Sequence, residues 1–270
     1  MTKKLRNITD KGFPPFITLV VIAAIWYAVC EGEIVPAFML PSPVDVVKAF
    51  VENIGYMAKE SVYTLQEAVY GLAAGILLAF VLATLMDKFS FVYKAFYPLL
   101  VISQTIPTIA IAPLLVLWMG YGMAPRITLV IITTFFPIAI GLLDGYRSVD
   151  ADSINLLRSM GAGRVQIFRH VKLPTAVPSF FSGLRIASSY AVVGALIAEW
   201  LGGNNGLGVY MTRVKKAYSF DKMFAVIVFI CVVSLLLMAV VRLIESLSMP
   251  YKKQYAPVRH RDTSKIRKDI

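Results

Sequence analysis

A few polar and ionisable side chains interrupt long apolar stretches of this sequence, and they are its best candidates for chemistry. Arg185 could attract an anionic solute or pair with a carboxylate, and Glu199 could gate or line a passage or cap its outer end. Gln104 and Thr105 stand beside Pro107, where an interrupted helix can expose backbone polar groups to a cavity. Each also has a structural interpretation, since Arg185 could reach the membrane surface or brace a dimer and polar residues can join helices. The residues expected along a solute passage are Gln104, Thr105, Pro107, Arg185, Ser188 and Glu199.

Other kinds of site are not indicated. The sequence has no GxxxxGK[ST] phosphate loop, no glycine-rich dinucleotide turn and no His, Cys, Asp or Glu set with metal-ligand spacing. Cys30 and Cys231 lie in or beside apolar runs, where packing is their expected role. Segments between the apolar runs are too short for an independent domain of about 50 residues. We therefore expect a chain that is not an enzyme and carries no cofactor or metal.

The composition indicates how these side chains are positioned. Of the 270 residues, 58% are hydrophobic and 16% are charged, and the mean hydropathy is +0.71. Soluble domains carry about 25% charged residues, so the apolar excess predicts contact with lipid. The formal charge of +11 could suggest nucleic acid, but the basic residues lie in short segments between apolar runs, as in an oriented membrane protein. We expect an all-α, polytopic membrane protein and no nucleic-acid partner.

Stretches of about 17 residues or more with few charges predict about six transmembrane helices. They cover residues 12–30, 68–86, 95–143, 173–198 and 223–241, and the turn Gly120-Tyr121-Gly122 divides the third stretch in two. A cleaved signal peptide is the alternative for the first stretch, but no small-x-small cleavage pattern ends it. The whole chain, 1–270, is expected to form one transmembrane domain. Its core would span about 60–245, with basic tails at 1–13 and 246–270.

The basic residues also predict an orientation. With a cytoplasmic N-terminus, the connecting segments on that side hold 18 Lys and Arg residues, and the opposite segments hold 7. The positive-inside rule therefore places both termini in the cytoplasm. On the outer side, Ser42, Pro43 and Asp45 have the types and order of a helix start. The helix that follows is expected to lie along the membrane surface or to pack on the spans.

The segment 150–174, between the fourth and fifth spans, predicts two short cytoplasmic helices. Asp150 or Ser148 can cap the first helix, Gly161 suits its C-terminal turn, and Pro174 is expected to break the second helix before span five. A short helix with one apolar face can insert into a groove on a partner protein. From composition alone, a basic loop resting on anionic lipid headgroups is an equal alternative.

The order of motifs resembles a known family. Gly161, nine residues, then Val171, one residue and Leu173-Pro174 resemble the EAA loop of bacterial ATP-binding-cassette (ABC) importer permeases. The same resemblance extends over about 40–245 and includes Gln104-Thr105-Ile106-Pro107, Ala112-Pro113-Leu114-Leu115, Phe135-Phe136-Pro137, Gly183-Leu184-Arg185, Ala198-Glu199-Trp200 and Gly206-Leu207-Gly208. These motifs are most similar to the branch that imports nitrate, taurine, aliphatic sulfonates and pyrimidine precursors of thiamine.

The resemblance implies partners and a mechanism. Its members form a permease dimer, expected here as a homodimer, in the bacterial inner membrane. Two ATPase subunits, which hold ATP and Mg²⁺, would dock on the loop and tilt the spans, and an external solute-binding protein would deliver the solute. The loop residues implied are Asn155, Leu156, Leu157, Met160, Gly161, Ala162, Arg164 and Pro174.

Two points depart from or compete with this interpretation. The family's Glu-Ala-Ala falls on Asn155-Leu156-Leu157, so the position of the acidic residue is retained and its charge is not. A secondary transporter that needs no ATPase is the rival class, although the inverted repeat typical of that class is not visible in the two halves. Among solutes, the stretches 168–174 and 198–203 most resemble importers of the thiamine precursor.

Overall fold

The computed structural model describes residues 2–36 and 39–249, with side chains from residue 17 onward, and all regular elements in this part are helices. The predicted tail 246–270 therefore lies largely outside the described residues. In chain order the elements are α1 (Thr2–Glu31), α2 (Pro43–Lys88), α3 (Ser90–Ser103), α4 (Thr108–Met119), α5 (Met123–Arg147), α6 (Ala151–Ser159), α7 (Arg164–Ile167), the π-helical turn η1 (Phe168–Lys172), α8 (Leu173–Gly202), α9 (Leu207–Lys216) and α10 (Phe220–Ser248).

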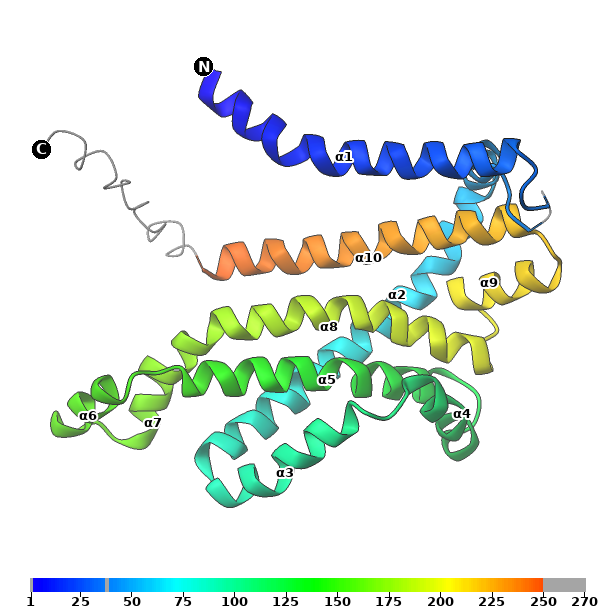
Figure 1. Ribbon diagram of the computed structural model, residues 1–270. Coiled ribbons are helices and arrows are strands. Elements are labelled where there is room, and N and C mark those ends of the chain that lie inside the picture. The colour runs from blue at the N-terminus through cyan, green and yellow to red at the C-terminus, as the bar shows by residue number, and fades with distance from the viewer. Residues whose placement is uncertain (1, 37–38, 250–270) are drawn as a thin grey trace, which may run out of the picture.

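The long helices form a layered bundle. Helix α8 lies between α5 and α10, α2 crosses behind them, and α1 runs along the outside (Figure 1). Within the described residues, 4 helices are long and apolar enough to cross a membrane, or 5 if the bent pair α3–α4 counts as one span. Ile17–Glu31, the apolar part of α1, is shorter than these helices and is not counted among them. The all-α, multi-pass architecture is confirmed, while the count of six spans stays a prediction.

Helix α2 begins where the sequence predicts and continues further than expected. Ser42 is its N-cap, because the Ser42 hydroxyl accepts the Asp45 backbone N–H at 3.2 Å, and Pro43 occupies the first turn. The helix then runs for 46 residues without a break, so the predicted outer helix and span two are one element. Its first part packs on the spans, because Val46 and Ala49 lie buried with Ala225 of α10. This is one of the two arrangements predicted for the outer helix, the other being a position along the membrane surface.

Close approach of α2 to α5 depends on two small residues. A side chain at Gly71 would overlap Val130 of α5, and one at Gly75 would overlap Thr134 one turn further along. The absence of side chains at these two positions lets the helices meet nearly backbone to backbone. The Gly71-x-x-x-Gly75 spacing thus serves the contact between α2 and α5.

The predicted third span is interrupted and forms two helices. Helices α3 and α4 are bent by 103° at the four residues 104–107, and Pro107 stands at the N-cap position of α4. A helix cannot continue through Pro107 in the usual way, because proline lacks the N–H that would bond to residue 103. Gln104 and Thr105 lie in this break, so the polar groups identified in the sequence flank an interruption in the span.

Pro174 does not break the helix before span five, and that prediction was wrong. The segment 164–202 is continuous and counts as one span of 39 residues. The π-helical turn η1 immediately precedes α8, and the N–H of Leu173, the first residue of α8, donates to the Phe168 carbonyl, five residues back. This wider turn accommodates Pro174 in the first turn of α8, because the usual bond to residue 170 is not required there.

Candidate functional site

The segment between α5 and α8 begins with a short, well-capped helix, α6. At its start the Asp150 carboxylate accepts the Asp152 backbone N–H at 3.4 Å. At its end the Ala162 N–H donates to the Leu157 carbonyl at 2.9 Å, and the Gly161 N–H donates to the Arg158 carbonyl at 3.0 Å. Gly161 has φ +85, so this is the left-handed C-terminal turn that glycine favours. Local sequence alone therefore defines both ends of α6.

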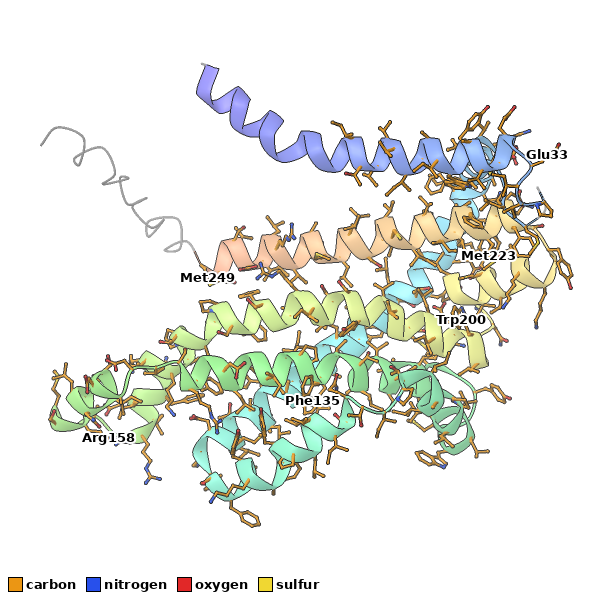
Figure 2. The ribbon with its side chains drawn as sticks, viewed as in Figure 1. Glu33, Phe135, Arg158, Trp200, Met223 and Met249 are labelled. Carbon is orange, nitrogen blue, oxygen red and sulfur yellow. The ribbon has the colours of Figure 1, made fainter. Side chains whose placement is uncertain are left out.

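Helix α6 extends from the end of the bundle with an apolar surface that the described residues leave uncovered. None of its residues is buried, and Leu156 and Met160 are 63% and 74% exposed. Val165, at the start of α7, is 78% exposed. Arg158 of α6 projects away from the bundle (Figure 2). Exposed apolar side chains of this size, held on a rigid helix, are typical of a docking surface for another protein.

The rest of this segment is fixed to the spans. The Lys172 ammonium of η1 lies 2.7 Å and 2.9 Å from the two carboxylate oxygens of Asp87, at the end of α2. The rings of Phe168 and Tyr146 pack at 5.3 Å between centroids, which joins η1 to α5. These contacts connect η1, which follows α6 and α7, to α2 and α5.

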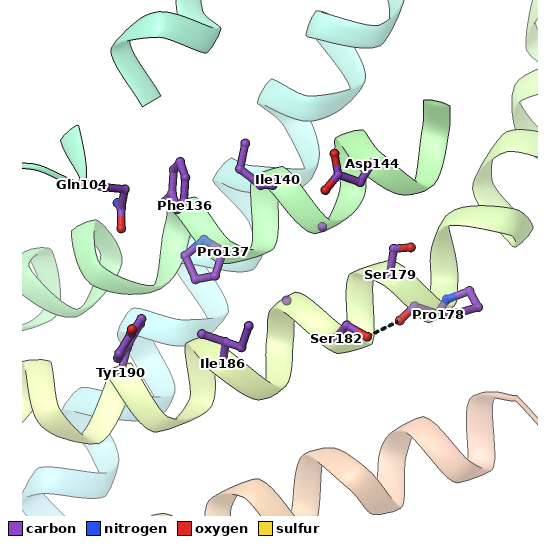
Figure 3. A pocket seen from close by; sticks show the side chains of 12 residues that line it. Gln104, Phe136, Pro137, Ile140, Asp144, Pro178, Ser179, Ser182, Ile186 and Tyr190 are labelled. Atoms are coloured by element: carbon purple, nitrogen blue, oxygen red, sulfur yellow. Dashed lines mark hydrogen bonds between the residues drawn. The ribbon is translucent and has the colours of Figure 1, made fainter. Parts of the chain in front are cut away.

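A groove of about 550 Å³ opens between α5 and α8, beside the break in the third span (Figure 3). Its aromatic part is formed by Phe136 and Tyr190, near Gln104. Toward the α6 end of the bundle it is lined by Asp144, Ser179 and Ser182. Volumes of about 300–1,000 Å³ are usual for sites that hold small molecules.

At the opposite end of the bundle, buried side chains hold the N-terminus of α9. The Gly206 N–H donates to Glu60 at 2.6 Å, the Leu207 N–H donates to the Thr64 hydroxyl at 2.9 Å, and the Gly208 N–H donates to Glu199 at 2.5 Å. The Thr64 hydroxyl in turn donates to Glu199 at 2.6 Å. Carboxylates satisfy the free N–H groups at the positive end of a helix. The short helix α9 is thereby fixed to α2 and α8.

A buried ion pair lies beside this cluster. The Arg126 Nη1 of α5 lies 2.5 Å from the Glu67 carboxylate of α2, and the Arg126 Nη2 donates to the Gly202 carbonyl at 2.9 Å. Glu67 is 1% exposed. Arg126 thus connects three elements, the middle of α2, the start of α5 and the end of α8.

This fold and its exposed capped segment agree with what comparison with known proteins finds. Residues 71–247 match the family model of the binding-protein-dependent transport system inner membrane component. The chain belongs to this family. It is a permease of the ABC importers. The alternative class, a secondary transporter, is not favoured.

Three relatives illustrate the branch of permeases. The formylaminopyrimidine transport permease protein ThiX of Halalkalibacterium halodurans is 35% identical over 90% of this chain and 98% of its own length. The riboflavin transport system permease protein RibX of Chloroflexus aurantiacus is 30% identical over 87% of this chain and 88% of its own. The putative aliphatic sulfonates transport permease protein SsuC of Bacillus subtilis is 31% identical over 87% and 86%. The predicted branch is thereby confirmed.

The structure places the expected passage residues of the permease in different surroundings. Gln104 lines the groove, while the Thr105 hydroxyl donates to the Ile102 carbonyl at 2.8 Å. Arg185 lies 3.2 Å from Glu245 of α10, so it is paired with a carboxylate, one of the roles expected for it. Ser188 is buried and donates to a carbonyl of its own helix. Glu199 belongs to the buried cluster around α9.

Sequence reasoning missed several partners in the permease. Glu67 and Arg126 were visible only as charges that border or interrupt apolar runs, and nothing local pairs two residues 59 positions apart. The Lys172–Asp87 pair spans 85 positions, which hides it in the same way. Asp144 follows the fourth predicted span directly, and its place in the groove depends on the packing of α5 against α8.

Proposed function

We propose that this permease forms half of the membrane pore of an ATP-driven importer, and that α6 with the start of α7 is the surface on which an ATPase subunit docks. The single observation that carries this proposal is the exposed apolar surface made by Leu156, Met160 and Val165 on a segment capped at both ends. A lipid-facing loop would not need a rigid helix that projects from the end of the bundle. We call these three residues the docking surface.

The connections of this segment supply a route for the mechanical step. ATP-driven closure of the ATPase moves α6, and η1 passes the movement to α2 through Lys172 and Asp87 and to α5 through Phe168 and Tyr146. Rigid helices that pivot together change which end of a passage is open. The continuity of η1 with α8 supports this route, because α8 carries the groove and ends at the α9 cluster.

The complete transporter in this proposal is a permease homodimer in a bacterial inner membrane. It carries two ATPase subunits with ATP and Mg²⁺, and a solute-binding protein docks on the outer side. The start of α1 and the end of α10 both lie at the α6 end of the bundle (Figure 1). With the excess of basic residues on that side, this supports a cytoplasmic location for both termini. Asn155 takes the position of the family's acidic residue and is exposed on α6.

The proposed solute is a formylaminopyrimidine, a pyrimidine precursor of thiamine. Support comes from the relative named for that solute, which is 35% identical and covered over 98% of its length. Identification of the ligand of the solute-binding protein encoded or purified with this chain tests the solute. A sulfonate, taurine or nitrate ligand would contradict it.

Co-purification tests the docking surface. The variant Met160→Glu places a charge in the apolar surface, so we expect the amount of ATPase that purifies with the permease to fall at least tenfold. A loss of about 1.4 kcal/mol produces such a change, which is less than the usual cost of truncating a central interface residue.

Tyr218→Glu is the matched control. Tyr218 is 78% exposed but lies between α9 and α10, at the opposite end of the bundle. This variant should retain the normal amount of ATPase, and both variants should insert into the membrane at wild-type levels. Normal ATPase recovery with Met160→Glu would contradict the proposed docking surface.

A further inference from the structure

We propose that the groove between α5 and α8 is a solute-binding site of the permease itself, and that it selects a neutral or cationic nitrogen heteroaromatic and rejects anions. This inference rests on the import function proposed above. It adds to that function a site within the membrane, the residues that form it and the charge of the solute that it accepts.

The first observation is the charge of the groove. Asp144 is the one charged residue among the described residues that line it. Within residues 17–36 and 39–249, its carboxylate has no hydrogen-bond or ion-pair partner in the protein. Its two oxygens are therefore available to accept hydrogen bonds from a solute.

The nearby cations do not cancel this charge. Arg185 donates to the Ser182 hydroxyl at 3.1 Å, but its other terminal nitrogen lies 3.2 Å from the Glu245 carboxylate, outside the groove. The Arg147 guanidinium lies over the ring of Tyr93, 3.7 Å from its centroid. An anionic solute would therefore meet the Asp144 carboxylate without a compensating positive charge in the lining.

The second observation is the match between the other lining groups and a flat, nitrogen-rich ring. Phe136 and Tyr190 supply aromatic faces in one part of the groove, and Gln104 supplies an amide that both donates and accepts (Figure 3). Ser179 adds a hydroxyl, and in the described chain the side chains of Gln104, Ser179 and Tyr190 have no protein partner. An aminopyrimidine offers N–H donors to Asp144, ring nitrogens to the amide and hydroxyls, and a face to the aromatic rings.

A sulfonate or nitrate would fit less well. These solutes require several donors or a cation, and the lining offers an amide and hydroxyls opposed by a carboxylate. Among the solutes after which these relatives are named, formylaminopyrimidine and riboflavin are nitrogen heteroaromatics and aliphatic sulfonates are anions.

The test is direct binding to the permease–ATPase complex in lipid nanodiscs without the solute-binding protein. Radiolabelled formylaminopyrimidine is the probe, and methanesulfonate and nitrate are the competitors. Asp144→Asn keeps the size of the side chain and removes its charge. We expect this variant to bind the probe about tenfold more weakly and to lose its discrimination against methanesulfonate. Tyr190→Ala should weaken probe binding by a similar factor through loss of the ring face.

Glu52→Gln is the matched control, because Glu52 is an exposed carboxylate of α2 outside this groove. It should bind the probe as the wild type does. Probe binding that is unchanged in Asp144→Asn would overturn the inference, as would a wild-type complex that imports the pyrimidine but does not bind it without the solute-binding protein. In both cases the proposed function stands. Import of an anion in place of the pyrimidine would overturn this inference and the proposed solute, and ATP-independent import would overturn the proposed function.

Discussion

Removal of Arg126 should destabilise the permease strongly, and removal of Glu67 with it should restore most of the loss. In Arg126→Met, the Glu67 carboxylate keeps its burial, at 1% exposed, and loses the cation 2.5 Å away. Breaking a buried pair by removing one partner costs about 3–5 kcal/mol. With a shift of roughly 2–4 °C per kcal/mol, the Tm should fall by about 6–20 °C.

The double variant Glu67→Met/Arg126→Met leaves no unpaired buried charge at this pair. Replacement of a buried ion pair by apolar side chains is often neutral, so its Tm should lie within a few degrees of the wild type. The assay is thermal unfolding of the purified permease in detergent, followed by size-exclusion chromatography after heating. Lys216→Met, which removes an exposed cation from α9, is the control and should change little. If the Tm of the double variant falls as far as that of Arg126→Met or further, the two residues are not coupled and the reasoning is refuted.

Three further predictions concern backbone turns and the connection to α2. Gly206→Ala should lower the Tm and transport, because Gly206 has φ +119 and its new side chain would overlap a buried carboxylate. Gly55→Ala is the control, because its new side chain meets open space and should not lower the Tm. Equal losses of Tm in the two variants would contradict this prediction. Gly161→Val should reduce ATPase co-purification more than Gly161→Asn, since the left-handed turn costs most L-residues about 1–2 kcal/mol and asparagine tolerates it. Similar effects of the two variants would contradict the role given to the left-handed conformation of Gly161. Lys172→Met should keep the ATPase bound while uncoupling hydrolysis from transport. The exchange Asp87→Lys/Lys172→Asp should recover part of the transport. A loss of ATPase binding in Lys172→Met would contradict the role given to this pair.

Local features of the fold were predictable from sequence because their causes are local. The start of α2 follows from Ser42 and Pro43, and the C-terminal turn of α6 follows from Gly161. The apolar runs predicted the long helices, since each run must bury its backbone polar groups in a helix to lie in lipid. Pro107 likewise predicted an interruption of the third span, although the angle of 103° depends on how α4 packs against α5 and α8.

Features that depend on contacts between distant segments were not predictable. The residues before Pro174 do not predict the π-helical turn that lets the helix continue, so a break was expected there. The groove and its Asp144 carboxylate exist because α5 lies against α8 beside the break in the third span. The partners of Glu199 come from α2 and α9, and its predicted place along a passage could not show that it holds the start of α9.

Photo-crosslinking tests the central claim, the docking of an ATPase on α6, most directly. A benzophenone amino acid is placed at Leu156, which is 63% exposed, in the complete transporter, and a second variant carries it at Tyr218 as control. The account predicts an adduct of permease and ATPase from position 156 and none from position 218. An adduct with lipid alone at 156, or an ATPase adduct from 218, would contradict it.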